Sequence, residues 1–240
     1  MKILIVLPAY NEELILEKSV LKLLAFCRQN LKIDWQIIIA DNNSKDKTAV
    51  IAKDLAAKFS AVRYLFVSQK GKGIAIKTAW QQYIADIYCF MDADLATDLL
   101  ALPQLISGIK EGNDLVIGSR FHSQSKVSRS LARKLTSQAY RLILKIILGL
   151  KINDAPCGFK AINQKTKEEI LNSVKSQEWF FDSELVILAE KTGYKIKEIP
   201  VSWYDPREGQ DKSRVKALSL GWEYFRQVLA LRKRIAKLKQ

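Results

Sequence analysis

Cysteine and histidine are scarce in this sequence of 240 residues. The three cysteines, Cys27, Cys89 and Cys157, show no paired spacing and make an odd number, which excludes a disulfide framework and a cysteine-based zinc site. Buried thiols in a reducing compartment are the expected arrangement. The single histidine, His122, is expected to be structural, so we assign it no catalytic role.

Long apolar stretches are absent as well. The N-terminal segment MKILIVLPAYNEE is too short in its apolar part for a signal peptide or a membrane span. The longest later stretch, residues 142–150, is interrupted by Lys145 and falls well short of the roughly 20 residues that cross a bilayer. We therefore expect no signal peptide and no transmembrane helix. Repeats and Pro/Gly-rich linkers are also missing, which predicts one globular domain with appendages.

Acidic residues are too few to balance the basic ones, and the formal net charge is +14. About +8 falls within residues 120–151, which contain no acidic residue, and about +8 within residues 212–240. A basic surface attracts phosphate, whether on nucleic acid, on anionic lipid or on a phosphorylated small molecule. Charge alone leaves these three kinds of partner open.

Short segments rich in β-branched residues alternate with segments of helical length. This rhythm predicts a mainly parallel α/β sheet, and Asn43 and Ser44 are expected to cap a helix over residues 46–59. The carboxyl ends of parallel strands meet at one edge of a sheet, where ligands bind. We therefore expect the polar residues that follow the strands to form a site. The expected strands cover residues 2–8, 35–41, 62–67, 86–91 and 114–118.

Two carboxylates, Asp92 and Asp94, follow the fourth expected strand. Such a pair suits one divalent cation, because Mg²⁺ or Mn²⁺ is often held by one or two carboxylates and completed by water and substrate phosphates. A nucleoside-diphosphate sugar fits this description, although Asp-x-Asp also occurs in ordinary turns. Gly71 and Gly73 would bring backbone N–H groups and lysine charge to a phosphate, or they mark a simple turn.

Seven short motifs occur in order along the chain: PAYNEE (8–13), DNNSKDKT (41–48), KGKG (70–73), DADLAT (92–97), GSR (118–120), CGFK (157–160) and FDSE (181–184). Together they resemble family-two glycosyltransferases, and most closely the dolichyl- and polyprenyl-phosphate glucosyltransferases and mannose synthases. The resemblance spans most of the chain, up to residues 201–203 and 212–214. It implies a GT-A fold, which is a Rossmann-like α/β nucleotide-diphospho-sugar transferase fold with a mainly parallel central sheet.

The resemblance also implies roles for the motif residues. Asp92 and Asp94 would bind the metal, Mg²⁺ or Mn²⁺, together with the donor diphosphate, and Lys72 would lie near the donor. Mannose synthases of this group often have a glutamine two residues after the second aspartate, where this chain has Ala96. That difference favours UDP-glucose over GDP-mannose as the donor. The residues implied to hold the nucleoside are Pro8, Tyr10, Asn11, Glu12, Asp41 and Asn43.

A polyprenyl phosphate is the acceptor that the resemblance implies. Arg120, Arg129 and Arg133 would lie near its phosphate, since arginine offers bidentate contacts that lysine cannot. Lys212 and Arg214 follow a Pro- and Gly-containing acidic stretch that would either close over the diphosphate or remain a solvated loop.

We expect a single inverting displacement, in which the lipid phosphate attacks the anomeric carbon and the nucleoside diphosphate leaves from the opposite face. The phosphate is already ionised near neutral pH, so a general base is dispensable. If a base is used, Asp182 and Glu184 are the candidates. Helix capping, or orientation of arginines, explains these two acidic residues equally well.

Two basic amphipathic segments, residues 126–151 and 215–239, combine apolar side chains at helical spacing with arginine and lysine. In the second segment the apolar face is expected to hold Leu218, Trp222, Phe225 and Leu229. Packing of the apolar stripes against the sheet is the alternative to membrane binding. With the resemblance, we predict a peripheral protein on the cytoplasmic face of an anionic membrane. Its catalytic domain would span residues 1–211, including the interface segment 126–151, and a basic helix would span 212–240.

Two other functions remain as alternatives. The same fold would also serve a saccharide or another non-lipid acceptor. A basic nucleic-acid-binding protein is a different class, but the sequence lacks a recognition-helix or base-stacking pattern, and this class leaves the strand-end carboxylates unexplained. We therefore expect no nucleic-acid partner.

Overall fold

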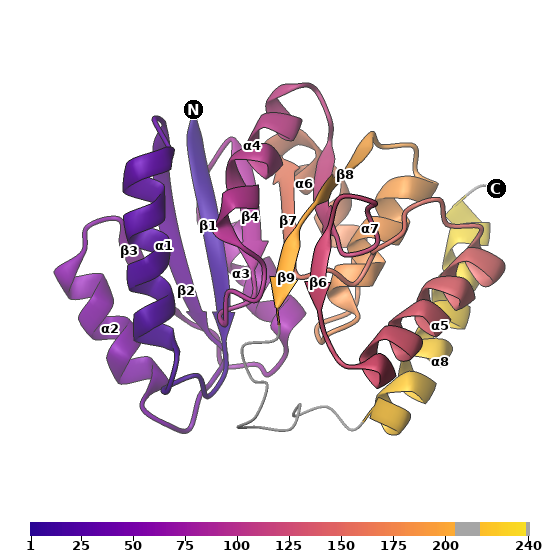
Figure 1. Ribbon diagram of the computed structural model, residues 1–240, viewed down its shortest axis with the longest axis horizontal. Helices are drawn as coiled ribbons and strands as arrows, with labels where there is room; N and C mark the ends of the chain where they lie inside the picture. The colour runs from indigo at the N-terminus through magenta and orange to yellow at the C-terminus, as the bar shows by residue number, and fades with distance from the viewer. Residues whose placement is uncertain (205–216, 239–240) are drawn as a thin grey trace.

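The computed structural model describes residues 1–204 and 217–238, with side chains described for residues 1–204 and 222–237. This part of the chain forms a seven-stranded sheet covered by helices on both faces, and a separate pair of short strands (Figure 1). The strand order in the sheet is β3-β2-β1-β4-β7-β5-β8. The strands are β1 (Lys2–Ala9), β2 (Asp34–Asp41), β3 (Val62–Phe66), β4 (Ile87–Met91), β5 (Leu115–Ser119), β6 (Lys126–Ser128), β7 (Phe159–Asn163), β8 (Ile196–Pro200) and β9 (Ser202–Tyr204).

The predicted mainly parallel sheet is confirmed, and β1 to β5 begin and end within one residue of the expected positions. The exception in direction is β7, which runs antiparallel to both of its neighbours, β4 and β5. The sequence analysis did not anticipate β6 to β9. β6 and β9 pair in parallel as the separate two-stranded sheet.

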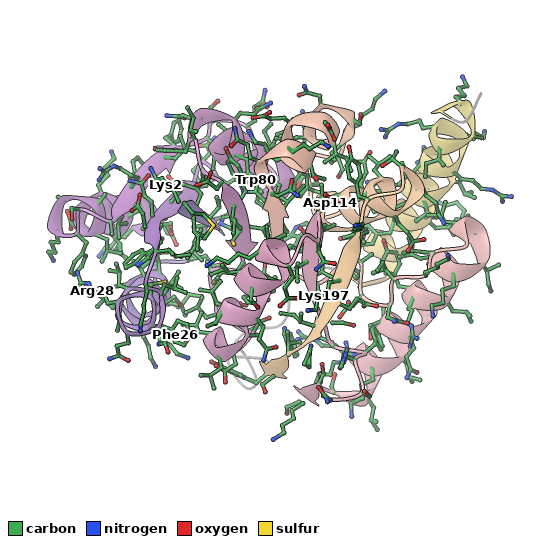
Figure 2. The ribbon with its side chains drawn as sticks, turned by 90° about the horizontal axis from the view of Figure 1, so that it is seen from above. Lys2, Phe26, Arg28, Trp80, Asp114 and Lys197 are labelled. Carbon is green, nitrogen blue, oxygen red and sulfur yellow. The ribbon has the colours of Figure 1, made fainter. Side chains whose placement is uncertain are left out.

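Two apolar clusters lie on opposite faces of the sheet, as the alternation along β1 requires. Leu4 and Val6 face the cluster that includes α3, α6 and α7, whereas Ile3 and Ile5 face the one that includes α1, α2 and α4. Figure 2 shows Trp80 of α3 and Phe26 of α1 on opposite sides. The helices are α1 (Leu16–Asn30), α2 (Thr48–Lys58), α3 (Lys72–Gln82), η1 (Leu99–Ala101), α4 (Leu102–Lys110), α5 (Leu131–Leu148), α6 (Gln164–Ile170), η2 (Leu171–Ser173), α7 (Phe181–Lys191) and α8 (Ala217–Leu238).

Helices α5 and α8 pack against each other at the end of the molecule opposite α2 (Figures 1 and 2). The rings of Tyr140 on α5 and Tyr224 on α8 lie 5.5 Å apart, and α8 buries Val228, Leu231 and Ile235. On the predicted apolar face of α8, Trp222 is 65% and Leu229 is 37% exposed, so this face is not the one that packs against the rest of the domain. Its predicted member Leu218 lies outside the described side chains.

The predicted cap of α2 by Asn43 and Ser44 is also wrong. The helix begins at Thr48, and Asn43 adopts a left-handed φ of 60°. The Ser44 hydroxyl instead accepts the backbone N–H of Asn11 at 3.0 Å, and the Asn11 side chain accepts the N–H of Lys45 at 2.7 Å. The loops that follow β1 and β2 therefore bind each other rather than the helix that comes next.

Candidate active site

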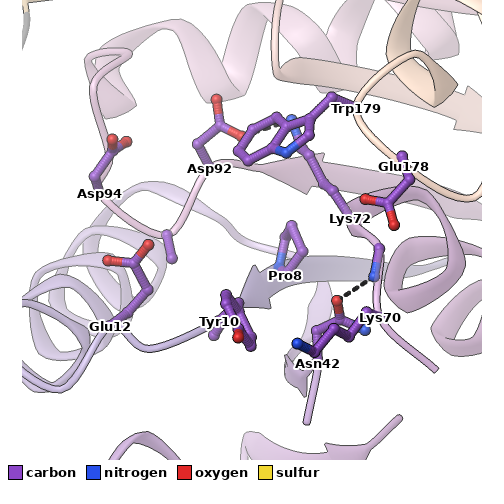
Figure 3. A pocket seen from close by; sticks show the side chains of 13 residues that line it. Pro8, Tyr10, Glu12, Asn42, Lys70, Lys72, Asp92, Asp94, Glu178 and Trp179 are labelled. Carbon is purple, nitrogen blue, oxygen red and sulfur yellow. Dashed lines mark hydrogen bonds and ion pairs between the residues drawn. The ribbon is translucent and has the colours of Figure 1, made fainter. Parts of the chain in front are cut away.

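The loops that follow β1 to β4 meet at one edge of the sheet, where the chain order of the strands reverses between β1 and β4. With the loop before α7 they line a cavity of about 440 Å³ (Figure 3). The predicted residues that line it are Pro8, Tyr10, Glu12, Lys72, Asp92 and Asp94. Gly71, a candidate for phosphate binding from the sequence, also lines it. The lining residues that the sequence analysis missed are Ala9, Asn42, Lys70, Ala93, Glu178 and Trp179.

Lys72 joins two acidic residues from distant parts of the chain. Its Nζ donates to Asp92 Oδ1 at 2.7 Å and to Asp182 Oδ2 at 2.6 Å. Burial opposes the charge of Lys72, but the two carboxylates, Asp182 more strongly, raise its pKa above the usual range. The ammonium group is therefore permanently charged and fixed beside the cavity.

Asp182 lies behind the cavity wall and not in its lining. Burial raises its pKa, and the charges of Lys72 and Lys160 oppose this shift. Among the described residues its second oxygen, Oδ1, has no hydrogen-bond partner. Lys160 is itself fully buried, and its Nζ donates to the carbonyl of Cys157. Burial lowers the pKa of Lys160. The predicted base Asp182 thus belongs to a buried network of carboxylates and lysines.

Two glycines allow the backbone to approach the site closely. A Cβ on Gly158 would lie 2.2 Å from Asp92 Oδ2, so the glycine of the CGFK motif is in contact with the first carboxylate. Gly71 has a φ of 136°, and a Cβ there would lie 2.2 Å from the carbonyl oxygen of Gln177. Both positions require glycine for steric reasons.

Asn42, not its predicted neighbours Asp41 and Asn43, lines the cavity at the end of β2. Its side chain accepts the N–H of Gly71 and donates to the carbonyl of Gln69, both at 2.5 Å. Asp41 is buried, and its carboxylate accepts bonds from the Tyr64 hydroxyl at 3.1 Å and from the Ser44 N–H. Burial and Asp41 raise the pKa of Tyr64 to about 12. Asp41 therefore shapes the loop from behind.

Tyr10 and Lys70 face each other across the lower part of the cavity (Figure 3). The Lys70 ammonium lies 5.6 Å from the centre of the Tyr10 ring, within the range of a cation–π contact. A half-buried aromatic ring beside a lysine offers a surface for a planar base and a cation for its phosphate.

Arg120 is paired with a buried carboxylate that the sequence analysis did not single out. Its Nε and Nη2 donate to the two oxygens of Asp154 at 2.9 and 2.8 Å, and its backbone N–H donates at 2.7 Å. Burial opposes the charge, but Asp154 raises the pKa of Arg120 above its usual range, and Asp92 adds to the shift. Arg120 therefore lies within electrostatic reach of the carboxylates of the site.

Arg129 differs from Arg120 because no acidic side chain neutralises it among the described residues. Burial lowers its pKa, and the neighbouring charge of Arg120 lowers it further. Its guanidinium lies 5.4 Å from the Phe121 ring, and Arg141 of α5 lies 4.9 Å from the same ring. Arg133 lies on the first turn of α5. The guanidinium groups of Arg129 and Arg141, which share the Phe121 ring, form a basic cluster that suits an anion.

Glu184, the second predicted base, does not line the cavity. One of its oxygens accepts the backbone N–H groups of Lys175 and Ser176, and the other binds Arg234 of α8 at 2.5 Å. The structure gives Glu184 contacts that hold the loop before α7 and the C-terminal helix in place. Lys212 and Arg214 lie outside the described residues.

A divalent metal fits the carboxylates that the strand β4 presents. Within the described part of the chain no cluster of three or more His, Cys, Asp or Glu side chains is present. Asp92 and Asp94 lie in a turn that is closed by a hydrogen bond from the N–H of Leu95, whose φ is a left-handed 50°, to the carbonyl of Asp92, and both aspartates line the same cavity. Two carboxylates are the protein share of a site that Mg²⁺ or Mn²⁺ completes with water and substrate phosphates. The donor set therefore suits a metal that arrives with its nucleotide.

This architecture, with a mainly parallel sheet and a two-carboxylate turn at its edge, is that of the GT-A glycosyltransferases, the class predicted from the sequence. Comparison with known proteins is more specific. Residues 4–185, more than half of the chain, match the model of glycosyl transferase family 2. The chain belongs to this family, and the predicted family is confirmed.

Several curated relatives are similar to this chain. Glycosyltransferase AglD of Haloferax volcanii is 31% identical over 202 residues, which cover 83% of this chain and 32% of that protein. The dolichyl-phosphate β-glucosyltransferase of Dictyostelium discoideum is 33% identical over 83% of this chain and 65% of its own length. The dolichol-phosphate mannosyltransferase of Pyrococcus furiosus is 28% identical over 97% of this chain and 64% of its own length. The chain spans about a third to two thirds of the length of these relatives.

A solved structure confirms the fold. Glucosyl-3-phosphoglycerate synthase from Mycobacterium tuberculosis, in complex with Mn²⁺, UDP and phosphoglyceric acid, superposes with a TM-score of 0.69. The match covers 96% of this chain and 76% of that protein at 22% sequence identity. At this level of identity the likeness establishes the GT-A fold alone.

Proposed function

We propose that this protein transfers a hexose from a nucleoside-diphosphate sugar to a polyprenyl phosphate at a membrane surface. The observation that carries the proposal is the cavity that Asp92, Asp94 and Lys72 line together with the half-buried Tyr10 and the exposed Lys70. Relatives named for dolichyl-phosphate glucosyl and mannosyl transfer support the lipid acceptor. UDP-glucose is the favoured donor, because Ala96 follows the second aspartate and several relatives are glucosyltransferases. GDP-mannose is the second choice.

The donor would occupy the cavity with its nucleoside toward Pro8, Tyr10 and Asn42 and its diphosphate toward Asp92 and Asp94. Mg²⁺ or Mn²⁺ on these two carboxylates would neutralise the leaving diphosphate. Glu12 and Lys70 complete the lining on the nucleoside side, and Asn11, Asp41 and Asn43 support the loops that carry these residues. Lys72 adds a fixed positive charge that does not depend on the metal.

The acceptor phosphate would bind among Arg129, Arg120 and Arg133. Arg129 is the strongest member of this set, because its charge lacks an acidic partner among the described residues and Arg120 repels it. A phosphate dianion there would relieve this repulsion and lie close to the donor diphosphate. We retain Lys212 and Arg214 as proposed phosphate ligands.

We propose a direct inverting displacement by the ionised lipid phosphate. The geometry supports a reaction without a dedicated base, since Asp182 is engaged by Lys72 and Glu184 is engaged by Arg234. In this mechanism Asp182 keeps Lys72 in place, and Lys72 positions Asp92. No proton has to be removed from the nucleophile.

Membrane binding is assigned to α5 and α8. Leu131, Leu135, Leu142 and Ile146 are all exposed and are spaced by four or seven residues along one stripe of α5. Trp222 of α8 is also exposed and stacks on Phe225. Lysine and arginine side chains flank these apolar residues, which is the pattern of a helix that lies in the plane of a membrane surface. The cytoplasmic face is our proposed location, and the division at residue 212 remains a proposal.

Among the described residues no helix is both long enough and apolar enough to span a membrane. A non-lipid acceptor on the same fold remains the alternative to the proposed reaction. The family assignment argues against nucleic-acid binding.

The test incubates the purified protein and Mn²⁺ with labelled UDP-glucose or GDP-mannose, with and without polyprenyl phosphate, and measures label extracted into organic solvent. We expect lipid-dependent transfer from UDP-glucose and a loss of about 100-fold or more in Asp94→Ala, on the scale of a lost charge-stabilising group. Asp98→Ala, an acidic residue nearby that does not line the cavity, is the matched control. Donor binding without transfer to lipid would contradict the proposed acceptor, and full activity of Asp94→Ala would contradict the site.

A further inference from the structure

Trp179 presents a large aromatic surface to the cavity. Its side chain remains 47% exposed, although most large apolar side chains of this domain are buried. It comes from the loop before α7, and its ring centre lies 5.3 Å from Lys72 Nζ. Figure 3 shows the indole beside Asp92 and Lys72, on the side of the cavity away from Asp94. An indole left half-exposed in a binding cavity is typical of a ligand contact.

The loop that carries Trp179 is held firmly to the rest of the site. The carbonyl of Gln177 accepts the N–H of Ile74 at 2.9 Å, and Gly71 packs directly against the same peptide. The Lys77 ammonium donates to the carbonyl of Val174 at 3.2 Å. These contacts join the loop to α3, the helix that begins with Lys72. The indole is therefore positioned before any ligand binds.

The position of Trp179 relative to the carboxylates limits what it can contact. A diphosphate bound at Asp92 and Asp94 directs its terminal group either toward Asp94 or toward Lys72 and Trp179. A sugar nucleotide carries two neutral groups on its diphosphate, the nucleoside and the hexose. With the nucleoside toward Pro8, Tyr10 and Asn42, the hexose is the group left for the wall that carries Trp179. A pyranose ring has an apolar face of C–H groups and a rim of hydroxyls, and the indole offers the complementary flat apolar surface. The adjacent Glu178 carboxylate lines the same wall and can accept hydroxyl hydrogen bonds.

We propose that Trp179 is a sugar-binding residue, on whose indole the donor hexose rests with its C–H face. This inference rests on the proposed function, because it takes the donor to be a nucleoside-diphosphate hexose. It adds a residue that distinguishes the complete donor from the nucleoside diphosphate alone. The lysine below the ring and the carboxylates beside it would hold the diphosphate, whereas Trp179 would hold the sugar.

The test compares the affinities of UDP-glucose and UDP by calorimetry in the presence of Mn²⁺, with GDP-mannose and GDP as a second pair. We expect Trp179→Ala to weaken the binding of the matching sugar nucleotide by about tenfold or more, on the scale of one aromatic contact, and to leave the nucleoside diphosphate within about twofold. Trp179→Phe should lose less. The matched control is Trp222→Ala, which removes another exposed tryptophan that does not line the cavity and should change neither affinity.

Several outcomes would overturn the inference. In Trp179→Ala, the affinities for the sugar nucleotide and for the nucleoside diphosphate could fall equally, or neither affinity could change. In the wild-type protein, the two ligands could bind with the same affinity. In the transfer assay, Trp179→Ala should raise the KM for the donor, and a rise confined to the KM for polyprenyl phosphate would instead place the ring at the acceptor. If the binding difference holds while transfer to lipid fails, the proposed acceptor is wrong and the sugar contact stands. Absence of binding by both nucleotide pairs would refute both proposals.

Discussion

Lys72 shows how one buried cation can organise a site made largely of acidic groups. It is in contact with Asp92, which lines the cavity, and with Asp182, which lies behind it. The side chains of Lys72 and Asp182 are 7% and 4% exposed, so solvent screens their interaction only weakly. We therefore expect the lysine to have two effects, one on the position of Asp92, a proposed metal ligand, and one on the stability of the domain.

Replacement of Lys72 by methionine tests the effect on stability. Removal of one partner of a buried ion pair typically costs about 3–5 kcal/mol, because the other charge remains buried. Burial already raises the pKa of Asp182, so in the variant the folded state binds a proton there more readily than the unfolded chain. The destabilisation should be largest near neutral pH and should shrink as the pH falls toward the folded-state pKa of Asp182.

Urea unfolding of Lys72→Met at several pH values measures this dependence. Lys70→Met is the matched control, since Lys70 is exposed, and its loss should stay within about 0.5 kcal/mol. If the free energy of unfolding falls by the same amount at every pH, Asp182 does not take up the proton, and the role assigned to Lys72 is wrong.

Among the strands and helices, those whose formation depends on a local pattern of apolar residues could be predicted from the sequence. Strands β1 to β5 consist of apolar, β-branched residues and were located to within one residue. β7 was missed because it carries the buried Lys160, and β6 and β9 were missed because each has three residues. The same division holds in the site. Of the residues that follow predicted strands, Pro8, Tyr10, Glu12, Asp92 and Asp94 were found and Asn42 was missed. Trp179 was also missed, because contacts with α3 fix its loop.

Helix α8 is attached to the site by one ion pair between elements. Arg234 binds Glu184 of α7 at 2.5 Å and the carbonyl of Ser173 at 2.5 Å, and Glu184 binds the loop that leads to Trp179. Glu184 was predicted as a possible base from its motif, but the sequence could not reveal a partner 50 residues away. The contact links the proposed membrane helix to the wall of the cavity.

Arg234→Ala should loosen α8 and the loop before α7 together. Hydrogen bonds to a charged group contribute about 1.5–3 kcal/mol, and the buried Glu184 would keep only its backbone donors. We expect faster hydrogen exchange in residues 174–180 and 222–237, measured by mass spectrometry. Arg232→Ala, an exposed neighbour on the same helix, is the control. Faster exchange in α8 alone would mean that the ion pair does not support the loop.

For the whole molecule, the distribution of charge and exposed apolar side chains favours one orientation relative to a membrane surface. The donor cavity lies at the carboxyl edge of β1 to β4, and α5 and α8 occupy the end of the molecule beyond β8 (Figure 1). Between them lies the cluster of Arg120, Arg129 and Arg141 around Phe121 and Trp203. A lipid phosphate approaching from a membrane at α5 would meet these cations before it reached the donor.

Leu142→Glu on the exposed stripe of α5 tests this orientation by sedimentation with vesicles of anionic phospholipid. The control is Thr136→Glu, an exposed position of the same helix off the stripe, which adds the same charge. The charge alone should cost about 1 kcal/mol. Loss of a leucine that becomes buried in the membrane should cost about 1.5–3 kcal/mol more, so Leu142→Glu should bind the vesicles at least about tenfold more weakly than the control. Equal weakening of the two would argue against insertion of the stripe.

The antiparallel strand β7 also has a consequence for how the protein is made. It is the strand that joins the half of the sheet containing β4 to the half containing β5, and both of these precede it in the chain. During synthesis the two aspartates of the β4 turn emerge early, whereas Gly158, which packs against Asp92, and Lys160, near Asp182, emerge only with β7. A nascent chain that ends before residue 158 therefore contains strands β1 to β5 but lacks Gly158 and Lys160, which lie behind the carboxylates of the site. The candidate site is therefore completed only when β7 pairs with β4 and β5. Pairing between residues so far apart in the sequence slows folding, and a fragment that ends before β7 lacks part of the site.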